Sequence, residues 1–327
     1  MMTGLHPGLV ASASFVLTAF LLSISTLKSS IPLLLTERFW PESGPVEIAF
    51  LSIYAACLTL LMLSKKKSSP IRLWMWRLFS FVFFLQLFLG LLGFSSFLMT
   101  GKLHLPIPAL ILAGPIYRGE GFFMLILFLC TVLLVGPAWC SHLCYIGAWD
   151  DIASRTQKRP TPLPRWKTVL RILIALLVVL VAALLSFLGL GSSIAFYLAF
   201  GFGVLGLLAM LIFSRRTGTM VHCTVYCPVG LLANLLGRFH PFSIRIGKQC
   251  TRCMKCQSAC RYEALSKHNI EDYKPGFTCS LCGDCIEACP HGQIHYHFGG
   301  LHSDGARKLF IVLAVSLHAT FLGLARI

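Results

Sequence analysis

The sequence is poor in charged residues, and above all in acidic ones. Only 12% of its 327 residues are Asp, Glu, Lys or Arg, and only 12 residues are acidic, whereas an average soluble domain carries about 25% charged residues. Hydrophobic residues make up 56% of the chain. This composition excludes an ordinary soluble protein and indicates an integral membrane protein with a smaller polar part.

Several signatures of common functions are also missing. The sequence has no Ser/His/Asp set, no phosphate-binding loop and no paired carboxylates that would indicate a hydrolase. No Lys/Arg run alternates with aromatics as a strand-binding groove requires, so the net charge of +16 does not indicate nucleic acid. The first apolar segment lacks a basic n-region and a clear small-residue cleavage site, which predicts a retained helix rather than a signal peptide.

Seven apolar segments are long enough to cross a membrane, because a span needs roughly 20 residues. Loops on one expected side hold 22 Lys and Arg and those on the other side hold 5, with Arg171 inside the fifth segment left out. Cytoplasmic loops are enriched in Lys and Arg. We therefore predict a multi-pass protein of a prokaryotic cytoplasmic membrane, with the N-terminus inside and the C-terminus outside. The segments are residues 9–27, 46–63, 78–100, 121–139, 169–189, 194–213 and 309–325.

Cysteine, in contrast, is abundant, and 12 of the 14 cysteines fall in four short clusters. Two clusters, "CTRCMKCQSAC" and "CSLCGDCIEACP", have the C-x2-C-x2-C-x3-C spacing of bacterial two-cluster ferredoxins, in which the fourth cysteine of each run binds the other cluster. Two complete runs favour [4Fe–4S] clusters over structural zinc. One [4Fe–4S] cluster is assigned to four cysteines that we call the first cysteine set (Cys250, Cys253, Cys256 and Cys289). The other [4Fe–4S] cluster is assigned to the second cysteine set (Cys279, Cys282, Cys285 and Cys260). Arg261 stands where a proline usually follows.

The other two clusters are near copies of each other. "WCSHLCYIG" (139–147) and "HCTVYCPVG" (222–230) share the form C-x3-C-x2-G. A spacing of four puts two cysteines on one helical face, and Pro228 prevents ordinary continuation of a helix, so we expect them at helix ends near the membrane surface. These paired-motif cysteines have the right number for one further iron–sulfur cofactor. Redox-active thiols and small residues at a helix contact are alternatives that the spacing leaves open. The paired-motif cysteines are Cys140, Cys144, Cys223 and Cys227.

Together, these motifs make the chain similar to a known family, the membrane ferredoxins of the NapH, NosR and MauN type. Such proteins combine several transmembrane helices, two C-x3-C-P motifs and two [4Fe–4S] clusters. The resemblance covers roughly residues 78–298. The chain departs from the family in two ways: it lacks the flavin-binding domain of the NosR branch, and Tyr145 stands where the motif has proline. The resemblance implies quinol oxidation that feeds nitrate reduction, nitrous oxide reduction or methylamine oxidation.

A quinone pocket needs apolar walls, a few polar groups and a proton acceptor. The stretch 101–121 is apolar, is broken by prolines, and contains His104, Arg118 and Glu120. It is typical of a re-entrant segment, although an exterior loop fits as well, and it is expected on the side opposite to the cysteines. His142 and His222, beside the paired-motif cysteines, are the alternative candidates, and each also fits a plain interfacial residue.

We therefore predict an all-α polytopic membrane protein with about seven transmembrane helices and a small α+β dicluster ferredoxin domain in the cytoplasm. By resemblance, it is an oxidoreductase subunit of a larger complex that passes electrons from the quinone pool to a partner reductase. The alternatives are a ferredoxin:quinone oxidoreductase running in reverse, a metal-reducing assembly factor for another redox enzyme, and a passive anchor subunit. The expected parts are an N-terminal helix pair with a basic loop (1–77), a four-helix core (78–247), the ferredoxin domain (248–298) and a C-terminal helix (299–327).

Overall fold

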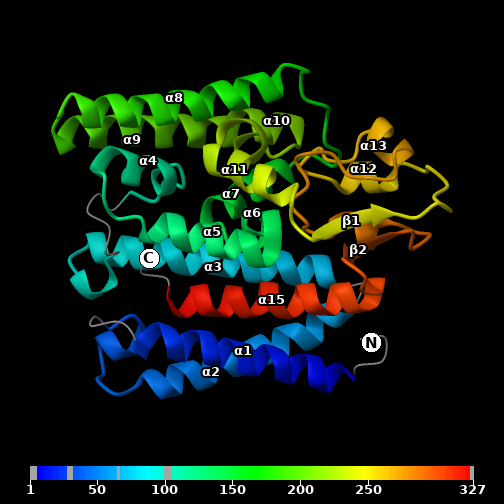
Figure 1. Ribbon diagram of the computed structural model, residues 1–327, viewed down its shortest axis with the longest axis horizontal. Coiled ribbons are helices and arrows are strands. Elements are labelled where there is room, and N and C mark those ends of the chain that lie inside the picture. The colour runs from blue at the N-terminus through cyan, green and yellow to red at the C-terminus, as the bar shows by residue number, and fades with distance from the viewer. Residues whose placement is uncertain (1–5, 28–31, 65–66, 99–104, 325–327) are drawn as a thin grey trace. The chain divides into compact units, whose positions relative to one another are not determined.

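The computed structural model describes residues 6–27, 32–64, 67–98 and 105–324. The chain is mostly helical, at 68%, and seven helices within these ranges are long and apolar enough to cross a membrane, as predicted (Figure 1). Contacts divide the chain into two compact units. Unit 1 comprises Met1–His104, Pro241–Ser243 and Tyr296–Ile327, and unit 2 comprises Leu105–His240 and Ile244–His295.

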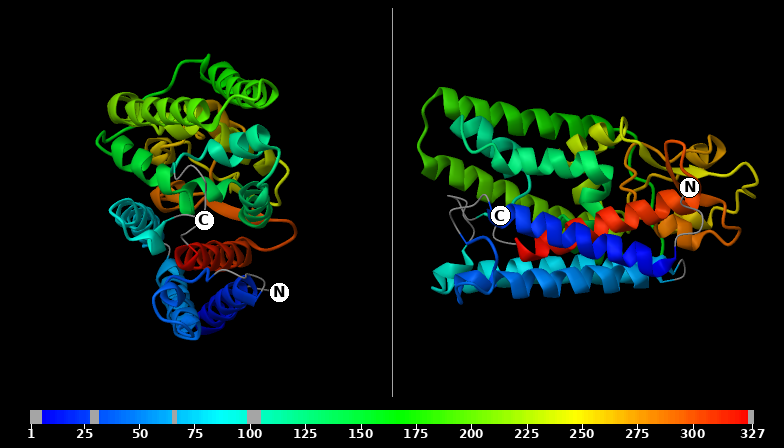
Figure 2. Two further views of the ribbon diagram at one scale, coloured as in Figure 1. Left: turned by 90° about the vertical axis from the view of Figure 1, so that its left-hand side faces the viewer. Right: turned by 60° about the horizontal axis from the view of Figure 1, so that its bottom comes forward.

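Unit 1 is built from four long helices. The helices α1, α2 and α15 pack against one another, and α3 contacts both α2 and α15, as the two views in Figure 2 illustrate. Several polar side chains are buried inside this unit, and two contacts join pairs of polar side chains on different helices: Thr59 Oγ1 donates to Ser14 Oγ over 2.7 Å, and Tyr54 Oη lies 3.1 Å from His318 Nε2. Such pairs are typical of helix contacts in membranes. The bounds are α1 (Pro7–Leu27), η1 (Thr36–Arg38), α2 (Gly44–Leu63), α3 (Ser68–Leu91), η2 (Ser95–Phe97) and α15 (Ser303–Gly323).

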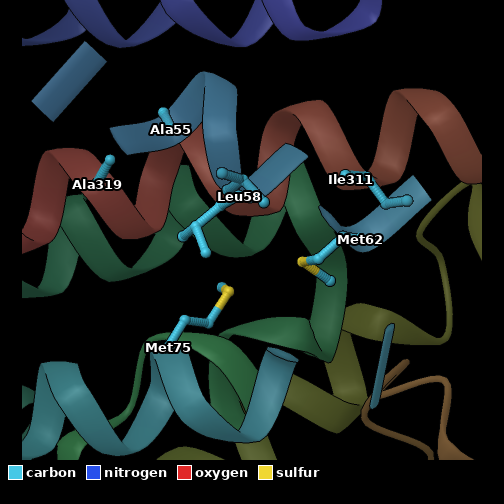
Figure 3. Close-up of a cluster of buried hydrophobic side chains, with 7 residues drawn as sticks. Ala55, Leu58, Met62, Met75, Ile311 and Ala319 are labelled. Carbon is cyan, nitrogen blue, oxygen red and sulfur yellow. The ribbon is translucent and has the colours of Figure 1, made fainter. Parts of the chain in front are cut away.

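The apolar core of unit 1 lies where α2, α3 and α15 meet. Leu58, Met62 and Met75 point toward one another there, with Ile311 and Ala319 on α15 completing the cluster (Figure 3). Flexible methionine side chains fill such irregular gaps well. This packing fixes α3 against α2 and α15.

The third span starts ten residues earlier than predicted. The sequence indicated 78–100, but α3 covers Ser68–Leu91, so the stretch expected as a basic loop forms the first turns of the helix. Pro70 is compatible with a first turn because the N–H that it lacks has no partner there. Arg72 is buried and lies over the Trp76 ring at 5.4 Å, which explains how a charged residue enters this helix. Gly93, with φ of 111°, follows its end.

Unit 2 contains the remaining spans and the paired motifs. The short helix α4 packs against α8, α11 also contacts α8, and α9 continues into the π-helical segment η4. Two of the membrane-length spans consist of several consecutive helical segments. Phe123–His142 includes α5, η3 and α6, and Ser192–Thr217 includes α9, η4 and α10. The bounds are α4 (Leu110–Arg118), α5 (Phe123–Val135), η3 (Gly136–Ala138), α6 (Trp139–His142), α7 (Tyr145–Ser154), α8 (Lys167–Phe187), α9 (Ser192–Leu208), η4 (Ala209–Ser214), α10 (Arg215–Thr217), η5 (His222–Tyr226) and α11 (Pro228–Gly237).

The ferredoxin signatures lie between two short strands that pair as a two-stranded sheet. Each four-cysteine run contains one short helix, α12 or α14, and a third helix, α13, begins with a capping box formed by Ser266 and Asn269. Gly247 N donates to Gln293 O over 2.7 Å just beyond the sheet. The bounds are β1 (Phe242–Ile246), α12 (Lys255–Ala259), α13 (Lys267–Glu271), α14 (Asp284–Ala288) and β2 (Ile294–Phe298).

Candidate iron–sulfur site

The two copies of the paired motif fold alike. Cys144 N donates to Trp139 O over 3.0 Å, and Cys227 N donates to His222 O over 2.8 Å, so each motif closes a wide, five-residue turn. The two second cysteines have nearly the same backbone angles, with φ/ψ of −79°/115° at Cys144 and −77°/117° at Cys227. Wide turns of this kind are frequent at functional sites.

The second cysteine of each motif is the N-cap of a new helix. The two cysteines of each motif would share one face only in a continuous helix, and here the chain turns between them. Pro228 takes the first position of α11, where proline is favoured, and Tyr145 takes the same position in α7. Tyr145 therefore fits the motif, because this position requires no N–H partner inside the helix.

A steric constraint explains why the second motif has glycine at position 230. Gly230 N donates to Cys227 Sγ over 3.4 Å, which brings its backbone close to the turn. A Cβ atom on Gly230 would lie 2.9 Å from Cys223 O, which is backbone and cannot move aside easily. Only glycine allows this close approach.

The four paired-motif cysteines converge, although the two motifs are 83 residues apart in the chain. All four are buried free thiols. Burial raises the pKa of Cys223 well above its usual value, and the other three thiols and Asp150 raise it further. Burial also raises the pKa of Cys144 to about 12, with Cys227 adding to the shift. Neighbouring thiols oppose one another's ionisation unless a positive group binds them.

Some groups around these thiols partly offset the effect of burial. The N-termini of α7 and α11 begin at Cys144 and Cys227, and a helix N-terminus carries a partial positive charge. The Gly230 N–H and Arg171 both partly offset the increase that burial causes in the pKa of Cys227. Asp150 Oδ2 accepts from Cys223 N over 2.9 Å and so fixes the second turn.

The structure brings each ferredoxin cysteine set together around its own hollow. The four residues of the first cysteine set line one small hollow, and the four residues of the second cysteine set line another. The grouping crosses the two runs, since Cys289 lies with the first run and Cys260 with the second. This is the arrangement that the ferredoxin spacing predicts.

The loops of both runs suit an iron–sulfur cluster. Arg252 and Met254 in the first run have φ of 54° and 59°, and Leu281 and Gly283 at the same positions of the second have φ of 56° and 82°. Residues other than glycine rarely adopt this backbone conformation. Its appearance at matching positions indicates that the two loops have the same structural role. Alternating left-handed residues turn successive N–H groups inward and form the anion-binding concavities found at many iron–sulfur sites.

A single metal ion fits these cysteines less well. Within the described ranges, no three His, Cys, Asp or Glu side chains lie close enough together to hold one ion. Zinc would need its thiolates about 2.3 Å from a common point, whereas a cluster binds one thiolate at each of several separate irons. The donor sets therefore suit clusters rather than single ions.

The paired-motif cysteines and the second cysteine set are joined by three direct contacts. Tyr262 Oη donates to Cys140 O over 3.2 Å, and Ser141 Oγ donates to Ser280 O over 2.8 Å. The third contact runs from Asn234 Nδ2 to Cys279 O over 3.5 Å. Each contact ends at a ligand candidate or its immediate neighbour in the chain, so the two sites are adjacent.

Arg261, which replaces the usual proline, strengthens this attachment. Its Nη1 donates to Ser154 O over 3.2 Å and to Gly218 O over 3.0 Å. These carbonyls lie near the ends of α7 and α10, where helix carbonyls lack partners. The departure from the ferredoxin pattern therefore holds the second cysteine set against the segments that carry the paired motifs.

The quinone-pocket candidates fall into two separate places. Arg118 and Glu120 are exposed at the end of α4, where Tyr117 Oη donates to Leu190 O beyond the far end of α8. At 1.5 Å per residue, that end of α8 is about 25 Å from Arg171 and the paired motifs. His104 lies outside the described residues. The structure therefore does not bring Arg118 and Glu120 to the paired-motif cysteines.

His142 and His222, in contrast, are buried beside the paired-motif cysteines. His142 Nδ1 lies 3.0 Å from Ser141 Oγ and 3.2 Å from Ala138 O. The His222 ring packs against Tyr226 with centroids 5.4 Å apart. Burial lowers the pKa of His222 to about 4, so this ring is neutral at neutral pH.

Sequence reasoning missed several residues around the paired motifs. Arg171 was set aside as a charge inside a span, although an ionisable residue in an apolar helix is itself a signal of function. Asp150, Asn234 and Tyr262 gave no signal that could be read from spacing, because their roles depend on contacts between distant segments.

Comparison with known families supports an iron–sulfur assignment at the paired motifs. The family model Fer4_5, described as a 4Fe-4S binding domain, matches residues 118–164 and 197–247. Each matched range contains one paired motif. The fold and these sites define the chain as an iron–sulfur protein with helices suited to a membrane.

Two curated proteins are similar to the chain. The first is YccM of Escherichia coli (strain K12), to which its name provisionally assigns electron transport, with 24% identity over 62% of this chain and 59% of YccM. The second is the uncharacterized protein MJ0749 of Methanocaldococcus jannaschii, with 22% identity over 50% of this chain and 65% of that protein. The chain thus spans about three fifths of each relative. No solved structure matches it.

Proposed function

We propose that the protein is a membrane-bound quinol dehydrogenase subunit, which takes electrons from the quinone pool and delivers them to a partner redox protein. The first and second cysteine sets would each hold a [4Fe–4S] cluster in a dicluster ferredoxin fold. The paired-motif cysteines would hold a third iron–sulfur cofactor. When bound, these groups supply one-electron transfer.

One observation carries this proposal: three hydrogen bonds join the segments that carry the paired motifs to the segments that carry the second cysteine set, with acceptors at Cys140 O, Ser280 O and Cys279 O. Three thiolate sites within one compact unit, two of them in direct contact, suit electron transfer and not merely structural stapling. The name of YccM and the description of the matched family point to the same chemistry.

The quinol would react near the paired motifs. The first motif begins in the last residues of the apolar stretch Phe123–His142, and the second lies shortly after the stretch Ser192–Thr217, so a lipid-soluble donor can approach them along the helices. His142 and His222 are buried histidines within these motifs. In this proposal, they form hydrogen bonds with the head group, whereas Arg118 and Glu120 lie too far away.

The partner would bind at the first cysteine set. Cys253 is exposed, unlike the other candidate ligands of unit 2, and the backbone N–H of Lys255 lowers its pKa. Exposed cations surround this edge, which favours an acidic partner by steering its approach. They are Arg245, Lys248, Arg252 and Lys255.

The charge distribution suggests a cytoplasmic location for all three sites. The contacts of Arg307 with Met62 O (2.7 Å) and Leu63 O (2.9 Å) put the start of α15 beside the end of α2, as alternating spans require. In the proposed orientation, both ends face the cytoplasm, together with the Lys- and Arg-rich loops.

Iron and acid-labile sulfide counts with EPR spectroscopy test the cofactors, using purified protein and the variant Cys223→Ser/Cys227→Ser. We expect wild type to contain more than the eight irons of two [4Fe–4S] clusters, and the variant to lose only the excess. Eight irons in both proteins would exclude the third cofactor.

Quinol-dependent reduction of the clusters tests the reaction, followed optically with menaquinol and ubiquinol analogues. We expect reduction by at least one analogue, and weaker reduction in His222→Phe and His142→Phe variants. The absence of any response across the analogues would reject the quinol dehydrogenase. Reduction potentials far below that of the quinone would instead indicate flow in the opposite direction.

A further inference from the structure

Arg171 is a charged side chain enclosed within unit 2. It lies one turn into α8, a helix of otherwise apolar residues from Ile172 onward, and only 2% of it is exposed. A buried guanidinium costs several kcal/mol unless a negative partner and hydrogen bonds compensate it. The position of Arg171 therefore requires an explanation.

Its hydrogen bonds account for only part of the guanidinium. Nη2 donates to Asn234 Oδ1 over 2.8 Å and to Cys223 O over 3.2 Å. Nε and Nη1 are buried and have no hydrogen-bond partner among the described residues. The ring of Phe277, two residues before Cys279, lies 5.9 Å from Arg171 Cζ.

No carboxylate of the described chain forms an ion pair with this cation. The acidic groups that interact with it are thiols of the paired motifs, namely Cys140, Cys223 and Cys227. Arginine keeps its charge under all ordinary conditions, so these thiols are the compensating groups that the fold provides. Four thiolates bring four negative charges, and an iron–sulfur core with a smaller positive charge leaves the site anionic.

We propose that Arg171 is the counter-charge of the iron–sulfur cofactor held by the paired-motif cysteines. Its Nε and Nη1 groups supply hydrogen bonds to the sulfur atoms of that site, while Asn234 and Cys223 O hold the guanidinium in place. Net charge and hydrogen bonds to sulfur set the potentials of such cofactors, so Arg171 raises the reduction potential. The inference rests on the proposed assignment of these four cysteines as ligands.

A redox titration followed by EPR tests the charge. The probe is the signal that is lost in Cys223→Ser/Cys227→Ser protein, and the variants are Arg171→Gln, Arg171→Lys and, as a control, Arg165→Gln. Arg165 is exposed just before α8. We expect Arg171→Gln to lower the ratio of reduced to oxidised cofactor at least tenfold at a fixed potential, which is 59 mV for a one-electron couple. Arg171→Lys keeps the charge and should stay close to wild type, as should Arg165→Gln.

A wild-type potential in Arg171→Gln protein would overturn the proposal. So would an Arg171→Lys shift as large as that of Arg171→Gln, because the effect would then come from shape and not from charge. Iron counts accompany each titration. Loss of iron in Arg171→Gln but not in Arg171→Lys supports the proposal, and equal loss in both counts against it.

Thermal stability gives a second readout, which does not depend on a redox signal. In the cofactor-containing protein, Arg171→Met should lower the unfolding temperature, since it removes the counter-charge. In a variant with all four paired-motif cysteines changed to serine, the same substitution should raise it, because the arginine there is an uncompensated buried cation. A purely structural arginine would give a decrease in both backgrounds, and that result would reject the inference.

The two levels of the proposal fail separately. If wild type contains only eight irons and the cysteine variant loses none, the third cofactor and the role of Arg171 both fall. Electron transfer through the first and second cysteine sets would be untouched by that result. If the third cofactor is present but insensitive to Arg171→Gln, only the present inference falls.

Discussion

Gly230→Ala tests the geometry of the second paired motif with the smallest possible change. The substitution adds one methyl group, which would lie 2.9 Å from Cys223 O and 3.2 Å from Arg171 Nη2. Neither position is free to move, since Cys223 N is bonded to Asp150 and Arg171 is bonded to Asn234. The turn must therefore open, which displaces both cysteines of the motif.

The expected cost follows from overpacking a closed site. An extra methyl group in a well-packed interior typically costs about 1–3 kcal/mol. In a unit of this size, each kcal/mol lowers the unfolding temperature by about 2–4 °C. We thus expect a decrease of several degrees, together with loss of the iron bound by the paired-motif cysteines.

The assay is thermal unfolding of the purified protein in detergent, combined with iron counts. Gly201→Ala in α9 is the matched control, because a Cβ at that position meets nothing within 4 Å. Alanine within a helix is favoured over glycine by about 0.5–1 kcal/mol, so the control should be neutral or slightly stabilised. Equal unfolding temperatures and iron counts for Gly230→Ala and wild type would refute the reasoning.

Three further substitutions test individual contacts. Asp150→Ala leaves the buried Cys223 N–H without its acceptor, so it should lower the free energy of unfolding by about 1–3 kcal/mol and cause loss of iron. Asp150→Asn keeps an acceptor oxygen and is the control. Equal unfolding temperatures and iron counts for the two variants would contradict this role. Arg261→Ala removes charged hydrogen bonds to three carbonyls and should cost at least about 1.5 kcal/mol in thermal unfolding; an unchanged midpoint would exclude the clamp. Thr59→Val removes the bond to Ser14 and should cost only about 0.6 kcal/mol; a decrease above 10 °C would indicate a larger role.

Local sequence was sufficient for the ferredoxin part. Ligand spacing predicted which cysteines would share a hollow, because a loop of two residues between thiols leaves the chain little freedom. The same spacing recurs in both runs, and the structure has left-handed residues at equivalent positions, including Arg252 and Leu281. Within each run the constraint is covalent and short-ranged, so it can be read from the spacing, whereas the exchange of Cys260 and Cys289 between the runs was expected only because two-cluster ferredoxins share that pattern.

The span boundaries were less certain for a physical reason. Hydropathy finds the apolar centre of a helix but not its ends, since charged side chains can enter when they are paired or stacked. α3 begins ten residues before its predicted start, and the added turns include Arg72 stacked over Trp76. The turn between Cys223 and Cys227 was also missed, because a spacing of four suits a continuous helix as well as a wide turn.

The sequence by itself indicated the class of the protein: its composition favours a membrane protein, and the spacing of its two four-cysteine runs favours iron–sulfur chemistry. Only the tertiary structure decided that the two distant paired motifs converge, that Tyr262 and Asn234 join them to the second cysteine set, and that Arg171 is enclosed with them. Spacing along the chain encodes local loops. The approach of segments tens of residues apart depends on how whole helices pack, and no short motif carries that information.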